Sequence, residues 1–246
     1  MPEYGLCWRP TEASVDPGWR PYFDRGHWIY TDNGWFWQSD YPWGDIVFHY
    51  GRWFRDVRFG WLWSPDYVWG PSWVCWRQAD GYCGWAPLPP AARFQAGVGL
   101  VYNGRVGVGV ELDFGLHAEQ FVFVGYDHFW EHDYHRFLLP RERMGFVFRS
   151  SRIMSNYRFA NNHFVVGGIG HERMAELTHR KVEIVVVPRS RVVERREARP
   201  EFRPAARPEM RPDARPESRS GAKPDVRPDA KGKPGDKGDD RSRKDR

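Results

Sequence analysis

Three histidines in the segment YDHFWEHDYHRF could bind a metal ion if that segment formed a helix. His128, His132 and His135 are spaced i, i+4 and i+7, so a helix would carry all three on one face. However, Gly125 precedes them and Pro140 follows closely, and both residue types interrupt helices. The zinc-enzyme pattern H-E-x-x-H is also missing. We therefore interpret the segment as a polar loop. A metal-dependent enzyme that uses these three histidines is the less favoured alternative.

Other residue patterns that are typical of enzymes are missing from the sequence. It contains no G-x-x-x-x-G-K-[ST] phosphate loop and no G-x-S-x-G nucleophile motif. The glycine-rich stretch 107–115, GVGVELDFG, alternates as a strand does. Asp40 and Asp66 occupy similar positions after Trp-rich segments, which fits turn chemistry better than acid–base catalysis. We therefore predict a protein that is not an enzyme and has no cofactor.

Cysteine residues offer a second kind of chemistry. The chain has Cys7, Cys75 and Cys83. Cys75 and Cys83 lie symmetrically in a predicted hairpin, which is one way to pair them, and three reduced, buried thiols are another. A C-x-x-C zinc pattern is missing. From spacing alone, both arrangements stay open.

Aromatic side chains could bind a ligand if some of them stay exposed. Such rings stack on sugars or surround a quaternary ammonium group. The Trp-rich segments contain few other large apolar residues, and burial of one aromatic side chain contributes about 2–3 kcal/mol, so we expect most Trp to form the core. An exposed minority near Arg20, Arg25, Arg52 and Arg55 would make the ligand contacts. The candidates are Tyr22, Tyr30, Tyr41, Tyr50, Tyr67, Trp28 and Trp53.

The Trp residues follow a repeat with a period of about 25 residues. Thirteen of the fourteen Trp precede residue 86. When residues 25–44 are aligned with residues 50–70, most Trp and Gly residues of the first segment align with the same residue type in the second. A partial copy precedes this pair at YGLCWRP, and a shorter copy containing Trp76 and Trp85 follows it. Matches at so rare a residue predict a repeated structural unit.

Each repeat has the features of a β-hairpin. The segments HWIYT and WFWQS are aromatic and β-branched, and DNG lies between them. Asn-Gly is typical of tight hairpin turns, and Trp residues at i and i+2 share one face of a strand. A lone hairpin is marginally stable in water, so we predict stacked hairpins that bury a shared Trp face. The predicted fold is mainly β.

The remainder of the chain divides into two parts. Residues 97–124 alternate as strands around a turn at Asn103-Gly104, and residues 161–187 predict a strand, a short helix and a strand. We therefore expect a hairpin domain at 1–90, a smaller β or α+β region at 91–188, and an Arg/Pro-rich tail at 189–246. The tail has a basic residue at every fourth position from Arg195 to Lys231, often followed by Pro, which predicts disorder.

Charge is divided unevenly between the body and the tail. Residues 189–246 hold 19 of the 37 basic and 12 of the 32 acidic residues. The tail is therefore +7 and the body −2, within a net charge of +5. Attraction to an anionic surface would belong to the tail, although such a segment can also serve only as a solubilising spacer. No apolar run is long enough to span a membrane.

The Trp-rich segments, from YGLCWRP to GYCGWAPLPP, resemble a bacterial family with YxWGxW-type repeats and unknown function. The resemblance covers residues 1 to about 90 and extends loosely to about 187. It implies export in a Gram-negative bacterium, to the periplasm or cell exterior. It also favours a disulfide between Cys7 and Cys83. We find no signal peptide at MPEYGLCWRP, and because exported relatives carry one, we expect the natural start to lie upstream.

These observations lead to three functional hypotheses. The first is a non-enzymatic envelope protein whose hairpins bind cell-wall or extracellular polysaccharide. The second is an interaction scaffold with a purely structural Trp core and a basic tail that docks on anionic envelope components. The third is the metal-dependent enzyme described above. Nucleic acid is not an expected partner, and the sequence does not define an oligomeric state.

Overall fold

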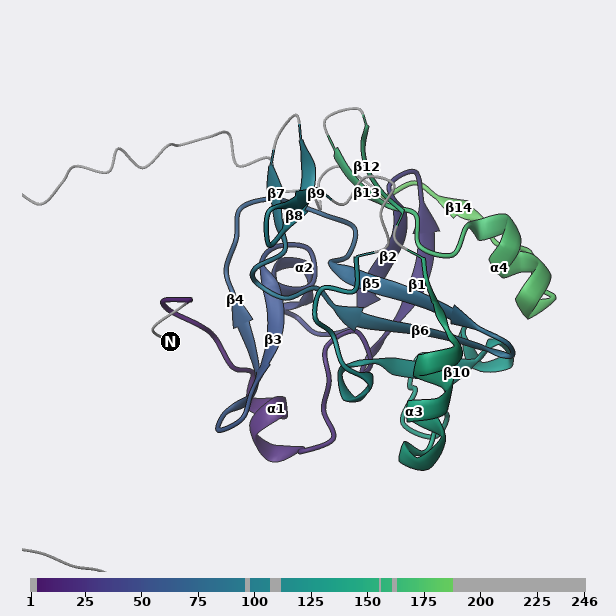
Figure 1. Ribbon diagram of the computed structural model, residues 1–246, viewed down its shortest axis with the longest axis horizontal. Coiled ribbons are helices and arrows are strands. Elements are labelled where there is room, and N and C mark those ends of the chain that lie inside the picture. Colours follow the sequence, from purple (N-terminus) through teal and green to yellow (C-terminus); the bar gives the residue numbers. More distant parts are fainter. Residues whose placement is uncertain (1–3, 96–97, 107–111, 155, 161–162, 188–246) are drawn as a thin grey trace, which may run out of the picture. The chain divides into compact units, whose positions relative to one another are not determined.

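The computed structural model describes residues 4–95, 98–106, 112–154, 156–160 and 163–187 (Figure 1). The described chain is mainly β, as the sequence predicted. The expected disordered tail at 189–246 lies outside the described residues. Among the helices in the described ranges, none has the length and apolar character needed to cross a membrane.

Three Trp-rich hairpins form where the sequence predicts them. Each places one Trp opposite another across its two strands: Trp28 opposite Trp37, Trp53 opposite Trp63, and Trp76 opposite Trp85. The three hairpins belong to three different sheets, so they are not neighbours in one ladder. The 25-residue repeat itself stays an interpretation of the sequence. The hairpins are β1 (Gly26–Thr31) with β2 (Gly34–Ser39), β3 (Arg52–Asp56) with β4 (Gly60–Ser64), and β5 (Val74–Ala79) with β6 (Tyr82–Pro87).

Strands from the second half of the chain pair with two of these hairpins. A hairpin leaves unpaired N–H and C=O groups along its outer edges, and later strands satisfy them here. One sheet has the order β12-β13-β2-β1-β14 and another has the order β10-β6-β5-β11. The expected division near residue 90 therefore runs through two shared sheets, and the described residues belong to one compact unit. The added strands are β10 (Val122–Gly125), β11 (Arg152–Ile153), β12 (Tyr157–Ala160), β13 (His163–Val166) and β14 (Ile184–Val185).

The predicted strand, helix and strand near the end of the body are β13, α4 (His171–Thr178) and β14. The predicted turn at Asn103-Gly104 is also present, between β8 (Gly99–Tyr102) and β9 (Arg105–Val106), which form a small sheet with β7 (Arg93–Gln95). Both turn residues have positive φ, 49° and 75°, as tight hairpin turns require. The second strand of this hairpin was expected to continue beyond β9. Residues 107–111 lie outside the described ranges, and residues 112–121 form no strand.

One helix, α3 (Arg141–Ser150), has no counterpart in the sequence-based prediction. It begins directly after Pro140 and buries Met144 and Val147 on one face. Gly145 and the aromatic pair around Val147 weaken its helical pattern in the sequence. The remaining short helices are α1 (Thr11–Val15), α2 (Gly44–Val47), and the 3₁₀ turns η1 (Ala118–Gln120) and η2 (Tyr126–His128).

Indole rings form the centre of the core, which confirms that most Trp are structural. The Trp28 ring centroid lies 4.8 Å from that of Trp76, 5.1 Å from that of Trp37 and 5.6 Å from that of Trp85. These tilted and edge-to-face contacts join the β1–β2 hairpin to the β5–β6 hairpin. Trp8 is the most exposed of the Trp residues, at 37%. The fully buried Trp residues are Trp19, Trp28, Trp35, Trp37, Trp53, Trp73, Trp76 and Trp85.

Candidate functional site: an aspartate and histidine cluster

Several aromatic rings that were candidates for exposed ligand contacts are buried. Trp28 and Trp53 lie in the core, and Tyr22 and Tyr41 are at most 4% exposed. The Tyr22 hydroxyl donates to the Phe48 carbonyl at 2.8 Å and accepts from the Trp73 backbone N–H at 3.2 Å. The expectation that these four rings stay outside is wrong, because their ring faces pack against other rings of the core. Tyr30 and Tyr50 are half-buried, and Tyr67 is exposed.

Arg52, which was expected near exposed rings, is also buried. Its guanidinium carbon lies 3.3 Å from the Trp73 ring centroid. Its Nε donates to the Ala92 carbonyl at 3.0 Å, and its Nη1 lies 3.9 Å from an Asp66 carboxylate oxygen. Burial lowers the pKa of Arg52 to about 10, and the Asp66 charge opposes that shift. This arginine therefore anchors the β3–β4 hairpin to the core.

Tyr41 connects the core to a polar cluster at the surface. Trp19 Nε1 donates to the Tyr41 hydroxyl at 3.1 Å, and that hydroxyl donates to Asp24 Oδ2. The Arg25 guanidinium carbon lies 4.9 Å from the Tyr41 ring centroid. Burial and the hydrogen bond to Asp24 raise the pKa of Tyr41. The hydroxyl therefore stays protonated and holds one Asp24 oxygen in place.

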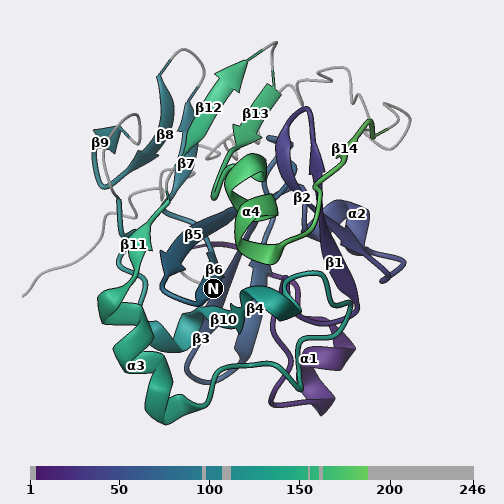
Figure 2. The same cartoon turned by 90° about the vertical axis from the view of Figure 1, so that its right-hand side faces the viewer.

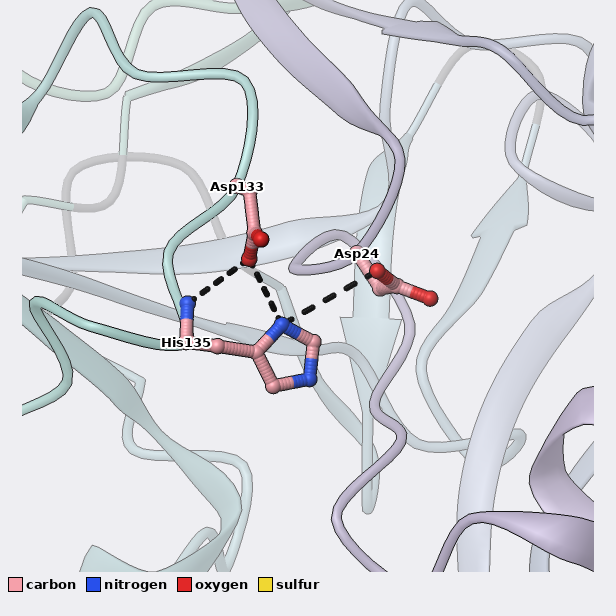
Figure 3. Close-up of side chains that lie close together, drawn as sticks. All are labelled: Asp24, Asp133 and His135. Carbon is pink, nitrogen blue, oxygen red and sulfur yellow. Dashed lines mark hydrogen bonds and ion pairs between the residues drawn. The ribbon is translucent and has the colours of Figure 1, made fainter.

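The cluster at the end of this chain of hydrogen bonds consists of Asp24, Asp133 and His135 (Figure 3). His135 Nδ1 lies 2.6 Å from Asp133 Oδ1 and 3.9 Å from Asp24 Oδ1. On the other side of the ring, His135 Nε2 lies 3.9 Å from Asp16 Oδ2. The Phe23 ring centroid is 4.6 Å from that of His135 and restricts its orientation. Three carboxylates thus surround one imidazole.

This geometry offers two carboxylates and one imidazole as possible ligands of a divalent cation. Hydrogen bonds from the backbone and ring N–H of His135 hold the pKa of Asp133 below its ordinary value. One ligand atom from each of Asp24, Asp133 and His135 lies within 4.8 Å of the others. The exposed fractions of these side chains are 18%, 65% and 38%. The cluster is therefore open to water, and its charges are well screened.

The three histidines that the sequence grouped together do not form a site. The segment is a 3₁₀ turn followed by turns instead of a helix. The His128 ring stacks on Phe137 at 4.0 Å and the His132 ring lies 3.9 Å from that of His27, centroid to centroid. Within the described ranges, the group of three metal-capable side chains is Asp24, Asp133 and His135. Sequence spacing missed Asp24 because that residue comes from a distant segment.

The expected disulfide between Cys7 and Cys83 is not formed, since Cys7, Cys75 and Cys83 are all free thiols. Cys7 precedes the isolated bridge between Trp8 and Trp63, whereas Cys83 is buried in β6 between β5 and β10. Burial raises the pKa of Cys75 to about 12 and raises that of Cys83 as well. These two thiols are therefore packing groups with little thiolate character.

We predict that Tyr41→Phe lowers the free energy of unfolding by about 1–2 kcal/mol. The change removes one hydroxyl and leaves the buried indole N–H of Trp19 without its acceptor. Urea denaturation monitored by fluorescence measures this loss. Tyr67→Phe is the matched control, because Tyr67 is 85% exposed and should change stability by less than about 0.5 kcal/mol. Equal effects of the two changes would contradict a structural role for the Tyr41 hydroxyl.

Residues 1–92 match the profile of a family of unknown function (DUF6600). The match spans the three Trp-rich hairpins and ends shortly after β6. It agrees with the expected resemblance of this part of the chain to a family of unknown function, and it supplies no activity. No curated protein and no solved structure matches the chain.

Proposed function

We propose that this protein is a non-enzymatic scaffold of the bacterial envelope. Its Trp-rich hairpins serve as a structural core, and its basic C-terminal segment docks on anionic envelope components. The location rests on the resemblance of residues 1–90 to exported Gram-negative proteins with YxWGxW-type repeats. The observation that carries the proposal is the burial of the Trp rings.

Burial of the indoles favours the scaffold over a polysaccharide-binding Trp array. Sugar rings stack on exposed aromatic faces. Eight Trp side chains of this protein, however, are at most 2% exposed. Their ring faces contact one another instead, as the contacts of Trp28 with Trp37, Trp76 and Trp85 illustrate. The body therefore has few aromatic faces left for a ligand.

The division of charge supports the docking role of the C-terminal segment. Residues 189–246 are +7, while residues 1–188 are −2. A basic residue near an anionic membrane surface contributes about 1 kcal/mol to the free energy of membrane binding. Several such contacts hold a protein at the surface at low salt and release it at high salt. The body itself would be repelled weakly, which leaves it free to present other surfaces.

Binding of the full chain to lipid vesicles tests this proposal. We expect binding to vesicles that contain phosphatidylglycerol, weak binding to pure phosphatidylcholine, and release as salt rises. Replacing the regularly spaced basic residues of the tail by Gln should weaken binding about a hundredfold or more. Substituted positions are Arg195, Arg199, Arg203, Arg207, Arg211, Arg215, Arg219, Lys223, Arg227 and Lys231.

A variant with the exposed body residues Arg58 and Arg158 changed to Gln provides the control. It should bind as the unmodified protein does, because the body does not make the contact. Binding that survives neutralisation of the tail, or that is insensitive to salt, would contradict the proposal.

A further inference from the structure

A polar cavity of about 380 Å³ lies at the tip of the β5–β6 hairpin. In Figure 1 this tip points between α4 above and α3 below, and Figure 2 shows the same region from the side of the tip. The cavity volume is at the lower end of the range of small-molecule sites. Side chains and backbone from five elements form its walls: Gln78, Ala79, Asp80, Gly81, Tyr126, Ser150, Arg152, Arg173 and Leu177.

The two arginines of the cavity come from different elements. Arg152 follows α3, and Arg173 lies in the first turn of α4. Among the described residues, no carboxylate forms an ion pair with Arg152. Arg173 pairs with Glu176 at 2.7 Å, but both side chains are more than half exposed, and such a pair contributes little. Both guanidinium groups therefore have N–H donors to offer an anion.

The floor of the cavity is held in place by hydrogen bonds. The buried Tyr126 hydroxyl donates to the Ala79 carbonyl at 3.1 Å and accepts a hydrogen bond from the Gln78 side chain. The charges of Arg173 and Asp80 shift the pKa of that hydroxyl in opposite directions, and both residues line the same cavity as Tyr126. The Asp80 carboxylate, at the tip of the hairpin, is the acceptor among the charged groups.

We propose that this cavity binds a hydroxylated monocarboxylate, the chemistry of a uronic-acid sugar. The carboxylate would accept hydrogen bonds from Arg152 and Arg173 in the planar, paired geometry that guanidinium groups favour. The sugar hydroxyls would donate to Asp80. One anionic group with several hydroxyl donors matches a lining of two cations and one acceptor.

The same lining disfavours other small ligands. A hydrogen phosphate dianion would bring two negative charges beside the Asp80 carboxylate and only one hydroxyl to donate to it. An apolar ligand would accept no hydrogen bond from either guanidinium group, and Leu177 is the large apolar side chain of the lining. A neutral sugar would use neither arginine, and hydrogen bonds to Asp80 alone would hold it too weakly for detectable binding.

Titration of the full chain with D-glucuronate, followed by ¹H–¹⁵N NMR, tests this proposal. We expect saturable shifts at Asp80, Gly81 and Arg152, with a Kd of about 1 mM. Arg152→Gln and Arg173→Gln should each raise Kd about tenfold or more. Glucose should produce no shifts at these residues. Since the readout is local to the hairpin tip, weak attraction of the basic tail for glucuronate does not interfere.

Arg158→Gln is the matched control, because Arg158 is an exposed arginine on β12 outside the cavity. It should keep the Kd of the unmodified protein. Thermal melts of all three variants verify that they fold. We expect all three to fold, because the substituted arginines are exposed. Equal binding of glucose would overturn the proposal, as would unchanged affinity in both cavity variants. Inorganic phosphate binding as tightly as glucuronate at the same residues would overturn the assignment to a sugar acid.

Discussion

Replacing Gly34 with alanine should lower the free energy of unfolding by about 3 kcal/mol or more, whereas the same change at Gly81 should cost only about 1 kcal/mol. Both glycines occupy hairpin turns with positive φ, 88° at Gly34 and 73° at Gly81. They differ in their surroundings. A Cβ at Gly34 would lie 2.0 Å from the Val166 carbonyl oxygen, while a Cβ at Gly81 would meet nothing within 4 Å.

The extra loss at Gly34 should appear where β13 meets β2. Val166 pairs with Gly34 in parallel, and its N–H donates to the Asn33 carbonyl at 3.0 Å. Because the clashing atom belongs to the backbone, it cannot move aside without breaking this contact. Hydrogen exchange should therefore show faster exchange of the Val166 amide in the Gly34→Ala variant, and unchanged exchange there in Gly81→Ala.

Urea denaturation of the two variants gives the comparison directly. Equal losses of stability would show that backbone strain alone accounts for the effects of both substitutions. The packing of β13 against β2 would then not require the absence of a side chain at Gly34. A larger loss at Gly34 with unchanged Val166 exchange would also contradict the argument, because the clash would then be relieved elsewhere.

Acidification from pH 6.5 to about 4 should lower the stability of this protein, and His49 should account for a large part of that loss. His49 is 3% exposed and its ring stacks on Phe36, with centroids 4.2 Å apart. Its Nδ1 lies 3.1 Å from the Gly70 carbonyl oxygen. Burial lowers the pKa of His49 to about 4, with hydrogen bonds from the ring opposing the shift.

The sign of the effect follows from the lowered pKa. The unfolded chain takes up a proton on His49 near pH 6.5, but the folded protein holds the ring neutral until pH falls to about 4. The stability contribution of the neutral ring is therefore complete above pH 6.5 and is lost as pH falls through this interval. The loss amounts to about 3 kcal/mol.

His49→Asn isolates this contribution. The Asn side-chain N–H₂ can still donate to the Gly70 carbonyl, but the residue does not titrate. We expect lower stability at pH 7, because the ring stack on Phe36 is lost, and a shallower decline between pH 6.5 and 4. Thermal unfolding measured across this pH range gives both quantities.

The matched control is His179→Asn, since His179 is exposed and has a left-handed backbone conformation that Asn tolerates. This variant should keep the acid dependence of the unmodified protein. A decline in His49→Asn as steep as in the control would assign the acid sensitivity to other groups. His27 would then be the next to substitute, because burial and the neighbouring His132 also lower its pKa.

The hairpins and the strand, helix and strand near residue 187 could be predicted because local chemistry specifies them. Asn33-Gly34 and Asn103-Gly104 are typical turn residues, and alternation along the flanking strands requires no knowledge of distant partners. The structural role of most Trp was likewise predictable from composition, because these segments contain little else to bury. Helix α3 was missed because Gly and aromatic residues weaken its local pattern.

The candidate site, in contrast, could not be predicted from spacing. Local spacing grouped His128, His132 and His135 because a helix would place them on one face, and this segment does not form a helix. The structure instead places His135 between Asp133 and Asp24. Asp24 reaches that position because Tyr41 and Trp19 hold it there through hydrogen bonds, and those contacts depend on the packing of distant segments.

The sequence by itself thus determined the secondary structure of the Trp-rich part, its dependence on indole burial and the separation of charge between body and tail. Tertiary structure alone decided which rings are buried, which thiols stay free, and which strands complete the two larger sheets. The physical reason is the separation along the sequence between the residues that interact. Turn conformation and side-chain alternation depend on neighbouring residues, whereas the burial of Tyr22 and the pairing of β13 with β2 depend on how remote segments pack.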